Sequence, residues 1–528
     1  MTSATESGQS TAETSPPTSS PPTARDRFGD LARDWPYWLL CALVLAWAVA
    51  VVLRHLWGGD WPLHVATVRS FAADLTDPPD PMTGERAPSP YLSPYPFALA
   101  VLARLTGLSA PGVLEIAGVV NVALTLAGVR AFARAVSTRW QTAFLGVLFV
   151  FLLWGTTPLL WSGFMEFRSL SANLGYPSTF AFALMLFVWA VFLKRRDTLG
   201  VPGFLGLGAL FGLILLVHPF TAVGTALGLL GFALIGFRRW LTGGGLLRVA
   251  AAGAAAVAVI LVWPYSDVAD LFRNPESFSQ IHERLVNDAL GWYGLALLGL
   301  PALWLDRRRR GGPELLALWA VASLFVLAGV VLGRYEFARA MPVVVLPLQF
   351  ALARRLGDPP PPGERAAWVR PVQVVLAVAS AAALCVGLYS VRGGVVRALP
   401  PAVMSQEEQR ESWDVPVLYP MQSYFAVAHV RPGETVLASR IWGRKALLLA
   451  GTRTVPTPWP YPYGSDWRQR QVDGEAFFAD STPPQERLRI ADRYRARCAV
   501  GSVNIAKRGA LPGFRLVAKH GTERMLCR

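Results

Sequence analysis

The chain has 528 residues, of which 53% are hydrophobic and only 16% are charged, whereas about a quarter of the residues in an ordinary soluble domain are charged. This composition excludes most soluble folds and indicates a polytopic membrane protein. The formal net charge is +15. The basic residues form short clusters between apolar runs, as in loops at an anionic membrane surface, so we expect membrane lipids and not nucleic acid as partners.

The N-terminal segment, residues 1–34, consists mainly of Ser, Thr, Pro, Ala, Gly and Glu and has no apolar periodicity. Such a segment cannot bury enough surface to fold, which predicts a disordered cytoplasmic tail. The first apolar run begins near Trp35 and is long enough to span a membrane. We therefore expect it to remain as a signal anchor and not to be removed as a signal peptide.

The next part, residues 35–392, is predicted to be a transmembrane domain with about 11 spanning helices, because it contains eleven apolar stretches of near-spanning length. These stretches lie at 36–57, 112–136, 141–161, 176–193, 199–217, 219–237, 246–264, 289–305, 313–332, 339–353 and 369–391. The run at 96–107 contains Arg104 and is shorter, which predicts an interfacial or re-entrant helix. If it crossed, the orientation of every later segment would change.

The loop charges predict the orientation, because cytoplasmic loops are enriched in Lys and Arg. With the N-terminus in the cytoplasm, every inward loop has at least three basic residues. These clusters lie within Arg25–Arg33, Arg130–Arg139, Lys194–Arg196, Arg238–Arg248, Arg307–Arg310 and Arg354–Arg370. We therefore expect a multi-pass plasma-membrane protein with a large first external loop at 58–111 and an extracytoplasmic C-terminal region.

The C-terminal region, residues 393–528, is charged throughout and is predicted to be a small extracytoplasmic α/β domain. Predicted strands lie at Thr435–Ser439, Thr452–Thr457, Cys498–Ile505 and Phe514–Lys519, and predicted helices at Arg444–Ala450 and Pro484–Tyr494. Cys498 and Cys527 both fall in this region. In an oxidising compartment they either form a disulfide or remain as two buried thiols.

The first external loop opens with Gly58-Gly59-Asp60-Trp61-Pro62-Leu63-His64. Asp60 lies where the first span leaves the bilayer, and a partly desolvated carboxylate at that depth is more basic than one in water. His64 follows one helical turn later, so both side chains can face one site. The alternative is that Asp60 only caps the next helix and that His64 is an interfacial side chain.

Three later outward turns carry further candidate substrate-binding residues. Glu166 and Arg168 in the second outward loop either form an internal ion pair or reach the same cavity as Asp60. His218 precedes Pro219 at an outward turn, where it either binds phosphate or a sugar hydroxyl or lies at the interface as an ordinary histidine.

The third turn, Gly333-Arg334-Tyr335-Glu336-Phe337-Ala338-Arg339, is predicted to be a tight outward hairpin. Arg334 and Arg339 can clamp a phosphate, or they can pair with Glu336 and with lipid headgroups. In the C-terminal region, Trp459, Tyr461 and Tyr463, together with Trp442 and Trp467, offer aromatic faces for a sugar. Ordinary packing in an irregular loop is the alternative.

Together these features resemble a known family. The Gly-Asp pair after the first span, the His-containing helix and the step from Tyr95-Pro96 into the apolar run at Phe97 are similar to the GT-C superfamily of integral membrane glycosyltransferases. That superfamily includes protein mannosyltransferases, oligosaccharyltransferase catalytic subunits and actinobacterial arabinosyltransferases. The resemblance covers most of the chain as architecture, and it implies a GT-C-like fold.

The resemblance also implies an activity. It implies inverting transfer of a sugar from a polyprenyl-phosphate donor to a glycan, lipid or protein acceptor in the cell envelope, with Asp60 as the general base and Tyr95 among the substrate-binding residues. The superfamily's first-loop acid can also bind a divalent cation such as Mg²⁺ or Mn²⁺. Many relatives have a second acid beside it, where this chain has Gly59 and Trp61, so a metal is left open.

Two other classes of function remain as alternatives. One is a transporter or flippase for a lipid-linked or anionic solute, and the other is a non-catalytic membrane scaffold. Transporters tend to have paired halves and ionisable residues at mid-membrane. This sequence has no detectable internal repeat, and its ionisable residues gather at one membrane face, which favours the glycosyltransferase.

Overall fold

The computed structural model describes residues 33–55, 59–266, 276–358, 369–403, 424–459, 461, 466–507 and 510–528. Most of the predicted disordered tail lies outside these residues, as do Arg25, Arg27, Gly58, Arg365 and Tyr463. The last residue of that predicted tail, Asp34, is buried and accepts ion pairs from Arg130 at 2.8 Å and Arg134 at 2.6 Å. The ordered bundle therefore begins at least one residue before Trp35.

Seven described helices are long and apolar enough to cross a membrane, and an eighth crossing results if a pair bent by 74° counts as one span. The seven are α2 (Trp35–Val52), α5 (Ala110–Val136), α8 (Pro177–Arg195), α11 (Gly243–Val262), α16 (Gly312–Val331), the segment Tyr335–Gly357 formed by η3 (Tyr335–Ala340) and α17 (Met341–Gly357), and Pro371–Ser390 within α18 (Val369–Ser390). The fold is thus that of a polytopic helical membrane protein.

The remaining elements of the bundle are shorter. The bent pair contains Ile281–Asn287 of α13 (Glu276–Asn287), followed by α14 (Ala289–Tyr293), η2 (Gly294–Leu298) and α15 (Gly299–Leu305). Three more apolar helices are α6 (Trp140–Leu152), α9 (Val201–Val217) and α10 (Pro219–Leu234), and two small elements are α7 (Phe167–Asn173) and η1 (Phe237–Leu241). Each of the eleven predicted stretches overlaps a helix, but the number of crossings stays a prediction.

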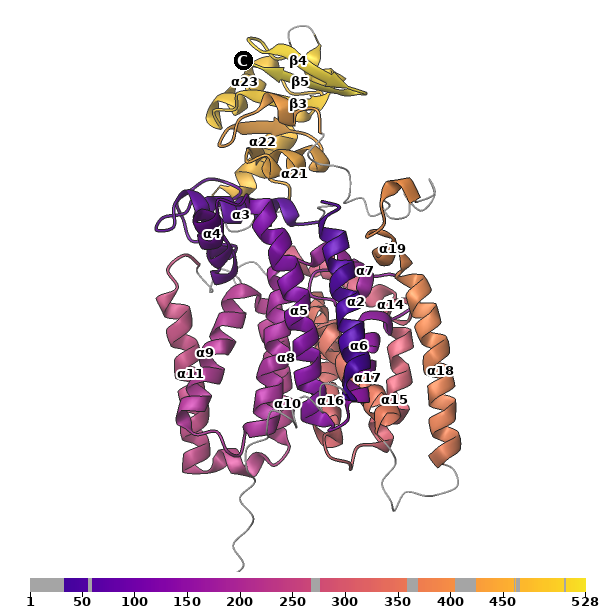
Figure 1. Ribbon diagram of the computed structural model, residues 1–528. Coiled ribbons are helices and arrows are strands. Elements are labelled where there is room, and N and C mark those ends of the chain that lie inside the picture. The colour runs from indigo at the N-terminus through magenta and orange to yellow at the C-terminus, as the bar shows by residue number, and fades with distance from the viewer. Residues whose placement is uncertain are drawn as a thin grey trace, which may run out of the picture.

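Two sequence features shape the bundle. Proline stands at the start of many helices, including Pro36 in α2 and Pro313 in α16, where its missing N–H group costs no hydrogen bond. Small residues let helices approach closely. A Cβ on Gly128 of α5 would lie 3.1 Å from the carbonyl oxygen of Ala183 in α8, so these two long helices pack along each other (Figure 1).

The long loop that follows α2 forms two helices at one end of the bundle, α3 (Trp61–Ala73) and α4 (Pro94–Thr106) (Figure 1). Arg104 of α4 donates hydrogen bonds to the carbonyl oxygens of Ala72, at 2.7 Å, and Ala73, at 3.0 Å. The 13 residues of α4 correspond to the run at 96–107. A helix of that length is too short to cross a bilayer in a straight line, and its interfacial or re-entrant placement stays a prediction.

The C-terminal region after α19 (Arg392–Val396) forms a five-stranded sheet of order β2-β1-β3-β5-β4. The strands are β1 (Thr435–Ala438), β2 (Arg453–Val455), β3 (Cys498–Ser502), β4 (Arg515–His520) and β5 (Glu523–Cys527), and the helices are α21 (Ile441–Leu449), α22 (Trp467–Phe478) and α23 (Pro484–Arg493). Strand β1 pairs parallel with β2 and β3, whereas β5 pairs antiparallel with β3 and β4. The six predicted elements are present, and α22 and β5 were not predicted.

Cys498 of β3 and Cys527 of β5 lie directly opposite each other in the antiparallel ladder and form a disulfide. Of the two alternatives that the sequence left open, the structure therefore has the bonded pair. Because β5 ends the chain, the bond ties the C-terminal strand to the centre of the sheet.

This α/β domain packs on the loop that follows α2, above α3 and α4 (Figure 1). Tyr461 forms hydrogen bonds with Asp80 and, at 2.7 Å, with the hydroxyl of Ser89. Arg69 of α3 donates to the carbonyl oxygen of Leu449. A small apolar cluster that includes Leu63, Met82 and Leu448 fills the interface. The first loop and the C-terminal domain thus form one continuous structure.

Candidate active site

Asp60 occupies the N-cap position of α3, yet its side chain makes no capping hydrogen bond. The capping alternative therefore does not account for this carboxylate. Burial raises the pKa of Asp60 above its usual value, while the positive charges of Lys445 and Arg339 oppose that shift. Asp60 is half-buried, and the charges of two cations act on it, one from the C-terminal domain and one from the bundle.

The backbone around Asp60 is fixed by Tyr176. The N–H of Asp60 donates a 2.6 Å hydrogen bond to the Tyr176 hydroxyl. Gly59 has a φ of +57°, which favours glycine, and a Cβ at this position would lie 2.8 Å from the same hydroxyl oxygen. Local geometry thus favours glycine before Asp60, because any other residue there would be strained and its Cβ would meet the Tyr176 hydroxyl.

Lys445 of α21 is the contribution of the C-terminal domain to this site. Its Nζ donates a 3.2 Å hydrogen bond to the carbonyl oxygen of Gly59 and lies 4.6 Å and 5.5 Å from the ring centroids of Trp459 and Trp442. Burial lowers the pKa of Lys445, and the charge of Asp60 opposes this shift. Two of the tryptophans predicted to offer faces to a sugar therefore surround the cation nearest the candidate base.

Arg339, at the end of η3, is a buried guanidinium with a relative exposure of 9%. The aromatic rings of Trp161, Phe164 and Phe220 surround it, the last at 4.7 Å from the guanidinium carbon to the ring centroid. Its Nε and Nη1 atoms have no hydrogen-bond partner among the described residues. A buried cation with unused donors is costly unless an anion binds to it, which makes Arg339 suited to a phosphate.

Two histidines complete the cluster. The ring of His64 lies edge-on to Tyr176, with 4.5 Å between centroids, and burial lowers the pKa of His64 to about 3. Its imidazole is therefore neutral at neutral pH. His218 caps α10 through its ring nitrogen Nδ1, which lies 2.7 Å from the Thr221 hydroxyl. Near Gly163, ring atom Cε1 of His218 and Nη2 of Arg339 border the same small space.

The other predicted site residues lie further from Asp60 or support it indirectly. Arg334 forms an ion pair with Glu336 at 2.5 Å, which is the alternative given for this hairpin. The Tyr95 hydroxyl donates to the carbonyl oxygen of Gly175 at 2.9 Å and accepts from Asn121. Because Gly175 precedes Tyr176, Tyr95 holds the segment that positions Asp60.

Glu166 and Arg168 flank the start of α7. Glu166 accepts a hydrogen bond from the N–H of Ser169 at 3.3 Å, and burial raises the pKa of Glu166 to about 8. Arg168 instead lines a separate pocket of about 260 Å³ with Arg392, Tyr389 and Thr156. The side chains of Glu166 and Arg168 therefore lie in different environments, the first at the start of α7 and the second in this pocket.

The aromatic residues predicted for sugar contact in the C-terminal region also lie in different environments. Tyr461 is buried and stacks on Tyr91, with 5.9 Å between ring centroids, so it has a packing role. Trp467 lies in α22 beside Arg468. Among the described residues of this aromatic set, only Trp442 and Trp459 lie beside Lys445, which makes them the aromatic candidates for sugar contact.

The residues at Asp60 do not fit a divalent cation. Within the described part of the chain, no group of three or more His, Cys, Asp or Glu side chains is arranged to hold a metal ion. The charged groups that act on Asp60 are two cations, and the residues on either side of it, Gly59 and Trp61, are not acids. A divalent ion prefers several oxygen ligands, so we derive no chemistry from one here.

Lys445 is the site residue that the sequence did not predict. Nothing in its local pattern distinguishes it from a surface lysine in a helix. Its only signal is rarity, because it is one of four lysines in the chain. The role of Tyr176 depends on a contact with Asp60, which is 116 residues away in the sequence, so a local pattern does not reveal it.

The comparisons with known proteins concern the fold. No protein-family model matches the sequence, and no curated protein matches it. Several solved structures match the fold, and two membrane enzymes are among them. One is the archaeal oligosaccharyltransferase AglB from Archaeoglobus fulgidus, with a TM-score of 0.52 and 13% identity over 89% of this chain and 70% of that chain; it was solved with an inhibitory peptide and a dolichol-phosphate.

The other is the arabinofuranosyltransferase AftD from mycobacteria, with a TM-score of 0.53 and 16% identity. The match covers 92% of this chain but only 40% of AftD. Both enzymes belong to the GT-C superfamily of membrane glycosyltransferases. The architecture that the resemblance implied is confirmed: the chain has the fold of the GT-C membrane glycosyltransferases.

Proposed function

We propose that this protein is an inverting membrane glycosyltransferase that takes a sugar from a polyprenyl-phosphate donor and passes it to an extracytoplasmic acceptor of the cell envelope. The observation that carries the proposal is the position of Asp60, a half-buried carboxylate that does not cap its helix and on which the charges of both Lys445 and Arg339 act. That arrangement supplies a base and phosphate-binding cations at one point.

The proposed chemistry uses each of these groups. The carboxylate of Asp60 takes the proton of the acceptor hydroxyl while the acceptor oxygen attacks the anomeric carbon. The raised pKa of Asp60 makes this carboxylate a stronger base than an exposed acid. The bond from the anomeric carbon to the phosphate oxygen breaks, and the lipid phosphate leaves with the electron pair. The unused donors of Arg339 bind the phosphate, and Lys445 adds positive charge.

The neutral residues would orient the two substrates. Trp442 and Trp459 flank Lys445 at the domain boundary, where they can stack on the acceptor sugar. His64 carries a neutral imidazole, so it can exchange hydrogen bonds with a sugar hydroxyl without adding charge. The AglB structure, which contains a dolichol-phosphate, supports a lipid-linked donor for a chain of this fold.

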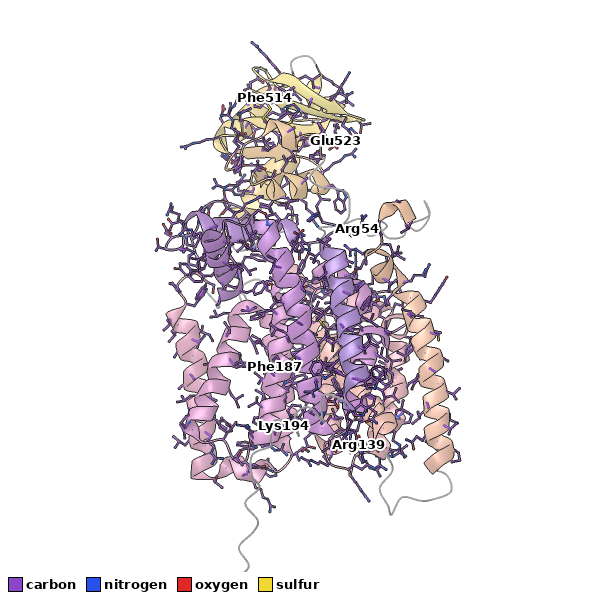
Figure 2. The ribbon with its side chains drawn as sticks, viewed as in Figure 1. Arg54, Arg139, Phe187, Lys194, Phe514 and Glu523 are labelled. Atoms are coloured by element: carbon purple, nitrogen blue, oxygen red, sulfur yellow. A yellow bond between two sulfur atoms is a disulfide. The ribbon has the colours of Figure 1, made fainter. Side chains whose placement is uncertain are left out.

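We also propose that the C-terminal domain and the site lie outside the cell. The basic clusters that include Arg139 and Lys194 lie at the end of the bundle opposite the C-terminal domain, which carries Phe514 and Glu523 (Figure 2). Basic residues favour the cytoplasmic side. The Cys498–Cys527 disulfide supports an oxidising compartment for the domain.

The test is a transfer assay on the full chain reconstituted in lipid. A panel of radiolabelled polyprenyl-phosphate sugars is incubated with a crude cell-envelope acceptor fraction, and wild type is compared with Asp60→Asn. We expect label to reach the acceptor fraction with wild type only, while both forms bind the carrier equally. Carrier binding without any transfer by wild type would instead support lipid transport, and equal transfer by both forms would remove Asp60 as the base.

A further inference from the structure

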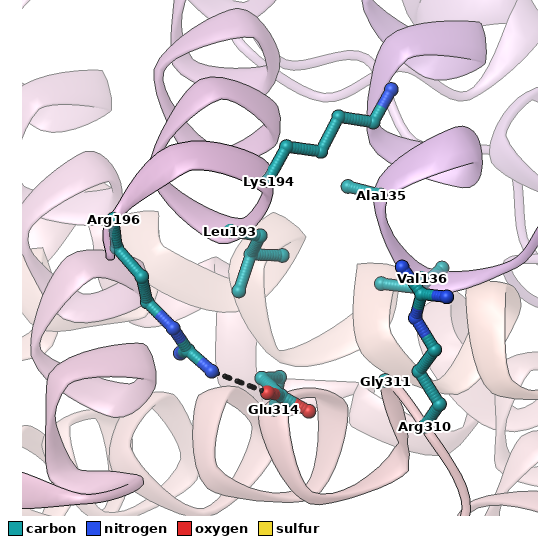
Figure 3. Close-up of a pocket in the computed structure, with 8 residues that line it drawn as sticks. All are labelled: Ala135, Val136, Leu193, Lys194, Arg196, Arg310, Gly311 and Glu314. Carbon is teal, nitrogen blue, oxygen red and sulfur yellow. Dashed lines mark hydrogen bonds and ion pairs between the residues drawn. The ribbon is translucent and has the colours of Figure 1, made fainter. Parts of the chain in front are cut away.

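A pocket lies at the end of the bundle opposite the candidate active site. Its volume is about 250 Å³, and it is bordered by the ends of α5 and α8 and by the start of α16. The charged side chains that line it are Lys194, Arg196, Arg310 and Glu314 (Figure 3). Three cations and one acid therefore line one small pocket at the ends of membrane helices.

The single acid of this pocket is already engaged. Arg196 donates a 2.9 Å ion-pair hydrogen bond to Glu314 (Figure 3). Lys194 and Arg310 form no ion pair and no hydrogen bond among the described residues. The excess positive charge of the pocket is therefore carried by two cations that the protein leaves unneutralised.

The surroundings add positive charge. Arg130, Arg134 and Arg195 all lie close enough to Lys194 for their charges to repel it. Arg130 and Arg134 share one carboxylate, that of Asp34. Like charges gathered without counterions cost free energy, and an anion in the pocket would remove that cost.

The backbone at the pocket also favours an anion. Gly311 caps α16 with a φ of +81° and offers no side-chain hydrogen bond to the helix. A Cβ at Gly311 would lie 2.6 Å from the carbonyl oxygen of Val136, so glycine brings the start of α16 against the end of α5. The positive end of the α16 dipole thus faces the same pocket as Lys194 and Arg310.

We propose that this pocket binds the phosphate of an anionic phospholipid headgroup, with Lys194 and Arg310 as its main ligands. Three helices that are long enough to span a membrane meet at the pocket, so it lies at the depth of headgroups and not of the bulk solution. In the proposed topology this is the cytoplasmic leaflet, whose anionic lipids attract basic residues. The inference does not depend on the glycosyltransferase activity.

The test uses the full chain purified in a neutral detergent. The melting temperature is measured during titration with phosphatidylglycerol, phosphatidylcholine or inorganic phosphate, and bound lipid is counted by native mass spectrometry. Three proteins are compared: wild type, the double variant Lys194→Gln/Arg310→Gln, and the control Arg139→Gln/Arg308→Gln. Both doubles remove two exposed arginine or lysine charges from the same end of the bundle, but only the first removes them from the pocket.

We expect phosphatidylglycerol to stabilise wild type and the control and to bind about 25-fold more weakly to the pocket double, since each basic residue near an anionic surface contributes about fivefold. The single variant Arg310→Gln should lose about fivefold. Both pocket cations are exposed and are repelled by their neighbours, so the lipid-free melting temperature of the pocket double should be no lower than that of wild type.

Three results would overturn the proposal. An equal loss in both double variants would show a general effect of surface charge. An equal response to phosphatidylcholine would show that the headgroup charge is not recognised. Full protection by inorganic phosphate alone would show that the pocket takes a free phosphate and not a lipid.

Discussion

Nζ of Lys445 donates a 3.2 Å hydrogen bond to the carbonyl oxygen of Gly59, although the two residues are 386 positions apart. This bond joins the C-terminal domain to the residue that precedes the candidate base. The charge of Lys445 also lowers the pKa of Asp60 against the effect of burial. The C-terminal domain is thus part of the candidate site and not an appended module.

The first prediction concerns the pH dependence of sugar transfer. A general base must be deprotonated, so activity should rise as the pH passes the pKa of Asp60. Lys445→Met removes a cation that lowers this pKa, so the acid limb of kcat/KM should move to higher pH. The control is Lys519→Gln, which removes an exposed lysine of β4. An unchanged acid limb in Lys445→Met would show that the charge of Lys445 does not affect the pKa of the catalytic base.

The second prediction compares the two arginines of one hairpin. Arg339→Gln should lower kcat/KM by about 10²–10³-fold, because it removes buried donors that stabilise the departing phosphate. Arg334→Gln should have little effect, since Arg334 pairs with Glu336 at the surface. Steady-state kinetics at varied concentrations of the lipid donor measure kcat/KM for both variants. Similar losses in the two variants would contradict the assignment of Arg339.

The third prediction tests the contact between Gly59 and Tyr176. Gly59→Ala should destabilise the protein by roughly 1–3 kcal/mol because φ is positive there, with a further cost because its Cβ would meet the Tyr176 hydroxyl. Tyr176→Phe removes that hydroxyl and leaves the N–H of Asp60 without its partner, at a cost of about 1–3 kcal/mol.

The double variant Gly59→Ala/Tyr176→Phe should be less destabilised than the sum of the two single variants, because the absent hydroxyl relieves the clash. Thermal unfolding of the four proteins measures this coupling. Strict additivity would show that the two groups do not touch.

The fourth prediction concerns Glu166, whose pKa burial raises to about 8. In the unfolded chain this acid loses its proton near pH 4.3. Between these two values the folded state binds more protons, so the stability contributed by Glu166 falls as the pH rises from about 4 to about 8. Glu166→Gln should remove this dependence and raise stability at pH 8 by up to a few kcal/mol. The melting temperatures of both proteins between pH 5 and pH 8 provide the measurement.

An equal slope in wild type and Glu166→Gln would contradict the raised pKa. A matched control is Glu475→Gln, on α22 of the C-terminal domain, where the acid is exposed. That variant should leave the slope of wild type unchanged.

The sequence by itself determined the membrane class, the helical segments and most strands of the C-terminal domain, because hydropathy and periodicity are local properties. It also offered Asp60, His64, His218 and Arg339 as candidates, since each lies near the end of an apolar segment. The structure brings these four residues, from three turns, to one end of the bundle. Local signals were sufficient wherever a residue's role depended on its position relative to the membrane.

Only the tertiary structure decided which of these residues have partners. Arg334 and Arg339 are five positions apart in one hairpin, yet one pairs with Glu336 and the other is buried with unused donors. Lys445 and Tyr176 reach Asp60 across long stretches of chain. Such contacts depend on how distant segments pack, and no local pattern of residues encodes that packing.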